Sequence, residues 1–228
     1  MKNRKNLISA LILLIGIPVI MAVGFLIFGG KRYAFISAGI AVLSCVPFFM
    51  SFERNSDNNS VKLVIISVMT ALSVAGRVLF SMLYGIKPVT AIIIIAALYL
   101  GSEAGFMTGS LTALVSNFFF GQGIWTPFQM FTWGLIGFIA GIFSEKLKKN
   151  RLILYVYGAL SGISYSLVID IWSVFWNYGE FDFSKYPVLI SSSFVFTLMY
   201  AVSNVIFLML LVKPIGGKLE RIITKYGI

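Results

Sequence analysis

The sequence contains no histidine, a single cysteine and few charged residues. Without histidine, acid–base triads built on imidazole and histidine-ligated metal sites are excluded. Cys45 lies in an apolar run and has no second cysteine for a disulfide or a thiolate metal site. We therefore interpret Cys45 as a buried structural residue.

Charged residues make up only 11 % of the 228 residues, whereas hydrophobic residues make up 59 %. Soluble domains are about one quarter charged, because a folded surface needs polar cover. The mean hydropathy of +0.95 points the same way. The composition predicts an integral membrane protein, and we expect an all-α fold, a polytopic bundle of membrane helices.

Several motifs of membrane enzymes and pumps are also missing. The chain has no G-x-x-x-x-G-K-[ST] sequence for binding ATP in a P-loop. Its eight acidic residues form no cluster that would hold Mg²⁺ and pyrophosphate, which disfavours a membrane prenyl- or phosphotransferase. The two halves show no obvious internal repeat of the kind that many secondary carriers have. A coupled pump that works alone is therefore disfavoured.

Long apolar runs are what the sequence does contain. A bilayer core of about 30 Å requires roughly 20 apolar helical residues. We expect eight spans, over residues 7–28, 34–52, 61–83, 88–101, 104–120, 126–144, 152–176 and 187–212. The first is too long for a signal peptide and lacks a small-residue cleavage site, so we interpret it as a retained span. Because the fourth and fifth runs are short, seven spans or a broken helix is the alternative.

A polar, turn-rich linker over residues 53–59 divides the chain. We expect residues 1–60 to form two additional N-terminal spans with this linker. Residues 61–228 would then form a six-helix core that binds the substrate.

The distribution of basic residues predicts the orientation. With both termini in the cytoplasm, 13 of the 18 lysines and arginines lie on the inner side, four lie on the outer side, and Arg77 lies within a span. Cytoplasmic loops collect lysine and arginine. The sequence thus predicts a multi-pass protein of the cell membrane, both termini cytoplasmic. The net charge of +10 favours contact with anionic membrane lipid, and no nucleic-acid partner is expected.

Small residues recur at helical spacing. Three G-x-x-x-G pairs lie on three predicted spans: Gly105/Gly109, Gly137/Gly141 and Gly158/Gly162. Such pairs allow helices to approach closely in lipid, and we interpret them as packing contacts. Ser67, Ala71 and Ala75 form a further stripe, which either packs internally or offers a flat docking face to a helix of another protein.

Aromatic and hydrogen-bonding side chains are mixed at the outer breaks around residues 118–129 and 172–186. Tryptophan and tyrosine are common as anchors at membrane interfaces, which is the alternative interpretation. Aromatic faces with a few directional polar groups are also what an organic ligand pocket needs. We therefore expect an outward-opening substrate site that includes Gln122, Trp125, Gln129, Trp133, Trp176, Asn177 and Tyr178.

Two ionisable residues, Arg77 and Asp170, lie inside predicted spans. Arg77 either extends to the lipid head groups or faces a polar cavity. Asp170 is too short to reach far. The two residues either pair with each other or contact substrate, and both are therefore candidate substrate-binding residues.

One segment resembles a known family. The sequence GQGIWTPFQM at 121–130 is followed by Trp133-Gly134 and by Gly137-Phe138-x-x-Gly141. This stretch, together with a six-span core that begins near Val61 and carries Ala71-x-x-x-Ala75 on its first helix, resembles the substrate-binding S components of energy-coupling factor (ECF) transporters. The resemblance covers about residues 61–215.

The resemblance implies a binding subunit and not an enzyme. An S component captures a vitamin or related micronutrient from outside and docks on a transmembrane coupling subunit. Two cytoplasmic ATPase subunits use the ATP, so this chain needs no cofactor of its own. Ala71 and Ala75, with Ser67, would face the coupling subunit, and the loops around 84–87, 121–129 and 177–186 would border the substrate. The two N-terminal spans depart from the usual six-span pattern.

The aromatic outer band favours a ligand with a large planar or apolar part. Cobalamin or a related corrinoid is the first expectation, and without histidine such a ligand would not be held through an imidazole–cobalt bond. The alternative function is a stand-alone secondary transporter of a small organic solute, in which Asp170 would carry coupling protons. A membrane-embedded enzyme is disfavoured, because no acid–base pair or metal cluster can be assembled.

Overall fold

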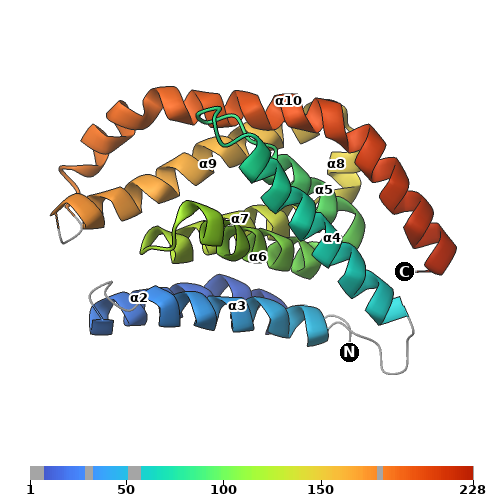
Figure 1. The fold of residues 1–228 in the computed structure, drawn as a ribbon, viewed down its shortest axis with the longest axis horizontal. Helices are drawn as coiled ribbons and strands as arrows, with labels where there is room; N and C mark the ends of the chain where they lie inside the picture. Colours follow the sequence, from blue (N-terminus) through green and yellow to red (C-terminus); the bar gives the residue numbers. More distant parts are fainter. Residues whose placement is uncertain (1–7, 29–32, 51–57, 179–181, 228) are drawn as a thin grey trace.

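The computed structural model describes residues 8–28, 33–50, 58–178 and 182–227, and within these ranges every regular element is a helix. A π-helical turn, η1 (Ile12–Gly16), precedes nine α-helices. They are α2 (Ile17–Phe28), α3 (Tyr33–Met50), α4 (Asn58–Leu79), α5 (Val89–Leu100), α6 (Ser102–Phe120), α7 (Trp125–Ile142), α8 (Ser144–Lys149), α9 (Arg151–Tyr178) and α10 (Tyr186–Tyr226). Figure 1 shows α2 and α3 as a layer on one side of the bundle and α9 and α10 on the other.

The all-helical membrane fold predicted from the apolar runs is confirmed. Three helices are long and apolar enough to span a bilayer, at Asn59–Leu79, Arg151–Phe175 and Tyr186–Tyr226. The count of eight spans stays a prediction, since the apolar helices at Ile8–Gly24, Tyr33–Pro47 and Val89–Leu100 have only 10–17 residues in the described ranges. Two further differences are local. The short helix α8 occupies part of the basic stretch after the predicted 126–144 span. Helix α10 continues well beyond residue 212, because Gly216 and Leu219 still pack inward while the lysines beside them face outward.

Helix α5 is the centre of the bundle. It packs against α4, α6, α7, α8, α9 and α10, and its isoleucines at 92–95 are at most 4 % exposed. A helix that is apolar on all sides belongs in such an interior. Its 12 residues extend about 18 Å, at 1.5 Å per residue, which is shorter than a bilayer core.

Helices α6 and α7 are packed backbone to backbone. A Cβ atom added at Gly105 would lie 2.6 Å from the carbonyl oxygen of Gly137, and one added at Gly109 would lie 2.3 Å from that of Trp133. A Cβ atom added at Gly162 would likewise lie 2.6 Å from the backbone nitrogen of Ala201 on α10. The glycine pairs therefore act in helix packing, as their spacing predicts.

The two basic stretches of the C-terminal half lie at the same end of the bundle, and Tyr99 at the end of α5 connects them. The amino group of Lys148 lies 5.4 Å from the Tyr99 ring centroid. On α10, Gly216 lies so close that an added Cβ would be 2.5 Å from the Tyr99 hydroxyl oxygen.

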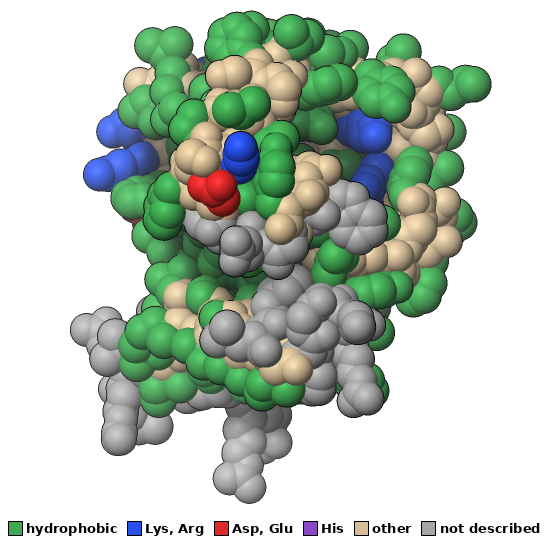
Figure 2. Space-filling model, turned by 90° about the vertical axis from the view of Figure 1, so that its left-hand side faces the viewer, with side chains coloured by type: hydrophobic (Ala, Val, Ile, Leu, Met, Phe, Trp, Pro, Cys, Tyr) green, Lys and Arg blue, Asp and Glu red, His purple; other side chains and the backbone are tan. Residues whose placement is uncertain are grey.

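Figure 2 views the molecule from the left of Figure 1, where mostly hydrophobic side chains are visible.

The N-terminal helices attach to one face of the bundle. Helix α3 packs against α6 and α7 and against the preceding η1 and α2. The Tyr33 hydroxyl donates a hydrogen bond to the carbonyl oxygen of Gln122, 3.3 Å away, in the turn between α6 and α7. Ser67, Ala71 and Ala75 on α4 remain exposed beside this layer.

Replacing Gly109 by alanine should lower the free energy of unfolding by about 1–3 kcal/mol, because the new methyl group collides with the backbone of α7. The matched control is Gly217→Ala on α10, where an added Cβ meets nothing within 4 Å. There alanine should leave stability unchanged or raise it by up to about 1 kcal/mol. Thermal unfolding in detergent measures both, and equal melting temperatures would contradict the α6–α7 contact.

Candidate functional site

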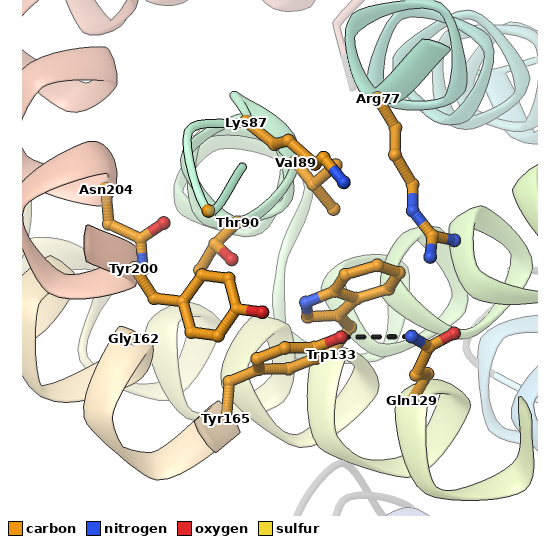
Figure 3. Close-up of a pocket in the computed structure, with 11 residues that line it drawn as sticks. Arg77, Lys87, Val89, Thr90, Gln129, Trp133, Gly162, Tyr165, Tyr200 and Asn204 are labelled. Atoms are coloured by element: carbon orange, nitrogen blue, oxygen red, sulfur yellow. Dashed lines mark hydrogen bonds between the residues drawn. The ribbon is translucent and has the colours of Figure 1, made fainter. Parts of the chain in front are cut away.

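A cavity of about 150 Å³ lies where the C-terminal end of α4 meets α5, α7, α9 and α10. The first residues of α5 line it, and Tyr99 is at the far end of that helix, so the cavity lies at the end of the bundle opposite the two basic stretches. Figure 3 shows the lining residues. They are Arg77, Gly85, Lys87, Val89, Thr90, Gln129, Trp133, Gly162, Tyr165, Tyr200 and Asn204.

Arg77, in the last turn of α4, points inward and is 8 % exposed. Its Nη1 atom donates hydrogen bonds to Ser116 Oγ and, at 2.7 Å, to Asn117 Oδ1. The guanidinium carbon also lies 4.7 Å from the Phe120 ring centroid and 5.1 Å from that of Trp133. Of the two positions considered from the sequence, Arg77 thus faces a polar cavity and does not extend to the lipid head groups.

A buried chain of hydrogen bonds continues from Asn117 into the cavity wall. Asn117 Nδ2 donates to Thr126 Oγ1 at 2.9 Å and to Gln129 Oε1 at 2.8 Å. Gln129 Nε2 in turn donates to the Tyr165 hydroxyl at 3.0 Å, the bond drawn in Figure 3. The Asn117 amide has three partners and the Gln129 amide has two, and buried networks satisfied in this way are rigid.

Three aromatic rings form one side of the cavity. Trp133 and Tyr165 are stacked, with centroids 5.2 Å apart and planes inclined by 8°. Tyr200 meets the Tyr165 ring edge-on, at 5.4 Å. In Figure 3 the Tyr200 hydroxyl points toward the space beside Trp133. Such rings present flat apolar surface next to hydroxyl groups.

Lys87 closes the cavity from the segment between α4 and α5. Ser203 of α10 makes two hydrogen bonds to the Lys87 backbone. The Lys87 N–H donates to Ser203 Oγ at 3.0 Å, and the Ser203 hydroxyl donates to the Lys87 carbonyl oxygen at 3.2 Å. The amino group lies 5.5 Å from the Phe120 ring centroid. Burial and the nearby Arg77 charge both lower the pKa of Lys87.

The structure brings together three of the residues selected from the sequence, Arg77, Gln129 and Trp133. Gln122 lies outside the lining and stabilises the turn after α6, donating to the Leu114 carbonyl at 2.8 Å and accepting from Thr126. Trp125 packs edge-on against Trp172, at 5.6 Å. Roles for Gln122 and Trp125 in substrate binding remain predictions.

Asp170 is buried but does not pair with Arg77. Its Oδ2 atom accepts a 2.6 Å hydrogen bond from Ser193 on α10, whereas the hydrogen bonds of Arg77 go to α6. Asn177 and Tyr178 are exposed at the end of α9. The Trp176 side chain lies outside the described residues, as do residues 179–181. Asp170, Trp176, Asn177 and Tyr178 thus remain predicted contacts.

Other lining residues were not selected from the sequence: Lys87, Thr90, Tyr165, Tyr200 and Asn204. The available signal was weak, since tyrosines and polar residues on membrane helices occur in many roles. Lys87 was not selected as a single residue, but it was counted as an outer charge and lies in the 84–87 loop that the family resemblance implies borders the substrate. Within the described ranges, no group of three or more histidine, cysteine, aspartate or glutamate side chains is placed to hold a metal ion.

Comparison with known proteins gives one match, to the family described as the ECF-type riboflavin transporter, S component, over residues 57–220. No curated protein and no solved structure matches the chain. The matched range begins just before α4 and ends within α10, so α2 and α3 lie outside it. Because the match spans well over half of the chain, this protein belongs to the S-component family of ECF transporters and is a transport protein, not an enzyme.

Proposed function

We propose that this protein captures a vitamin with a planar ring system in the cavity beside Trp133 and Tyr165, and that riboflavin is the first ligand to test. The carrying observation is the combination of stacked rings with oriented amides from Gln129 and Asn204 in one buried site. Rings bind planar ligands on their faces, and amides fix the orientation of polar edges. The description of the matched family supports riboflavin.

The size of the cavity disfavours the corrinoid expected from the sequence. Ligand pockets usually measure about 300–1,000 Å³, and this cavity measures about 150 Å³. Any vitamin, riboflavin included, therefore requires this cavity to widen on binding, and a corrin macrocycle with its nucleotide loop would require by far the most widening. Neither the cavity nor the family description supports cobalamin.

The positions of the cavity and of the basic residues support ligand capture from outside. The cavity lies opposite the end that carries the basic residues at 146–151 and 213–225. With these residues in the cytoplasm, by the positive-inside rule, the cavity lies toward the outer surface. Both termini would then be cytoplasmic, and residues 61–228 would form the substrate-binding core.

Inward delivery requires the partners of an ECF transporter, a coupling subunit and two ATPase subunits. An apolar groove of about 660 Å³ along α4 and α6 is a suitable contact surface. Ser67, Ala71 and Ala75 line it, and all three are exposed. Small side chains permit close approach of a partner helix in lipid, which supports docking along α4.

Ligand binding is tested with the detergent-purified chain and with native mass spectrometry of material from its own host. We expect a co-purified mass of vitamin size and quenching of flavin fluorescence when riboflavin is added. Trp133→Leu should weaken binding about tenfold, equivalent to about 1.4 kcal/mol, because a stacking surface is lost. Trp172→Leu, which removes a tryptophan outside the cavity lining, is the control.

Failure of riboflavin to bind at millimolar concentration, while a different vitamin co-purifies, would exclude riboflavin and leave the cavity assignment in place. Equal loss of affinity in both tryptophan variants would contradict the cavity as the binding site.

Docking of the coupling subunit on α4 is tested by replacing two small side chains of this helix with larger ones. Ala71→Leu/Ala75→Leu should abolish ATP-dependent uptake and co-purification of the coupling subunit while sparing ligand binding, because the larger side chains block close helix approach. The control is Ala34→Leu/Ala38→Leu, an exposed pair with the same spacing on α3. Uptake that survives the α4 double substitution would remove the docking assignment.

A further inference from the structure

The cavity contains two cationic side chains and no acidic one. Arg77 and Lys87 line it, and the other lining residues are neutral. No described carboxylate forms an ion pair with either residue, and the buried carboxylate Asp170 is bonded to Ser193. Charges inside membrane proteins are normally paired with an opposite charge. Two cations that share a binding cavity without an acidic partner therefore require an explanation.

Arg77 is held in place with three of its five N–H donors unused. Both hydrogen bonds described above come from Nη1, and both go to neutral acceptors on α6. No described residue accepts from Nη2 or Nε. These two nitrogens form the planar edge of a guanidinium that binds a carboxylate or phosphate in bidentate fashion. In Figure 3 the guanidinium group points into the space above Trp133 and Gln129.

Lys87 approaches the same place from the opposite side. Its amino group and the guanidinium of Arg77 both lie against the Phe120 ring, at 5.5 and 4.7 Å from the centroid. The side chain extends toward Arg77 in Figure 3, although like charges repel. The two hydrogen bonds to Ser203 fix the Lys87 backbone, from which the side chain extends into the cavity.

We propose that the ligand carries an anionic group, a carboxylate or a phosphate, which binds between Arg77 and Lys87 while its ring lies against Trp133 and Tyr165. This inference rests on the proposed function, since it concerns the same cavity. It predicts that, among planar compounds of the same ring system, the acidic ones bind more tightly than the neutral ones. The anion would occupy the free edge of Arg77 and balance both charges, and a neutral vitamin leaves them uncompensated.

The test compares matched neutral and acidic probes on the purified full chain in nanodiscs of neutral lipid. The pairs are riboflavin with riboflavin 5′-phosphate, nicotinamide with nicotinate, and pyridoxine with pyridoxine 5′-phosphate. Within each pair that binds, we expect the acidic member to bind at least about tenfold more tightly, the gain typical of hydrogen bonds to a charged group.

Lys87→Gln should reduce this preference to about twofold or less, because it removes one charge and leaves the backbone bonds to Ser203 intact. Lys87→Arg should restore it. Lys218→Gln, which removes an exposed lysine of α10 at the end of the bundle opposite the cavity, is the matched control and should leave the preference unchanged. Lys87 is the preferred site of substitution, since removal of Arg77 also disrupts the hydrogen bonds to α6 and endangers folding.

The outcomes separate this inference from the proposed function. Riboflavin that binds as tightly as its phosphate would overturn the inference and leave the proposed function intact. An acidic probe of another pair that binds while both flavins fail would exclude riboflavin and support the inference. Absence of binding by every acidic probe would overturn it. The inference would also be overturned if phosphatidylglycerol in the nanodiscs removed the preference for acidic probes, because a lipid head group would then bind between Arg77 and Lys87.

Discussion

The need to solvate one guanidinium group inside an apolar bundle governs the arrangement of this protein. Arg77 is buried in the last turn of α4, where water is scarce and a bare charge is costly. Ser116 and Asn117 on α6 accept its hydrogen bonds, and Asn117 passes the interaction to Gln129 and Tyr165 on α7 and α9. Four helices are thereby oriented around a single charge.

The glycine contacts between α6 and α7 make this arrangement stable. The backbones meet without intervening side chains at Gly105 and Gly109, one of them directly beside the carbonyl of Trp133. Asn117 on α6 and Gln129 on α7 are thereby held within 2.8 Å of each other. Packing determined by small residues thus positions the polar and aromatic groups of the cavity.

Much of the fold was predictable because apolar length and charge asymmetry are local properties of the sequence. Arg77 was recognisable as an unusual charge within a span, and Gln129 and Trp133 lie in the stretch that carries the family resemblance. Tyr165, Tyr200 and Asn204 were not predictable, since only tertiary packing determines which face of α9 and α10 turns toward the cavity. In the sequence the aromatic residues at the helix ends give the stronger signal, whereas the cavity lies between the helices.

The backbone contact between α6 and α7 also limits how the cavity can change shape. Because the two backbones touch at glycines, these helices cannot slide past each other without a collision, and Gln129 and Trp133 keep a fixed position relative to α6. Arg77 and Lys87 lie across the cavity from them. Because Ser203 bonds both the N–H and the carbonyl group of Lys87, the segment before α5 is tied to α10, and a displacement of α10 would carry Lys87 with it.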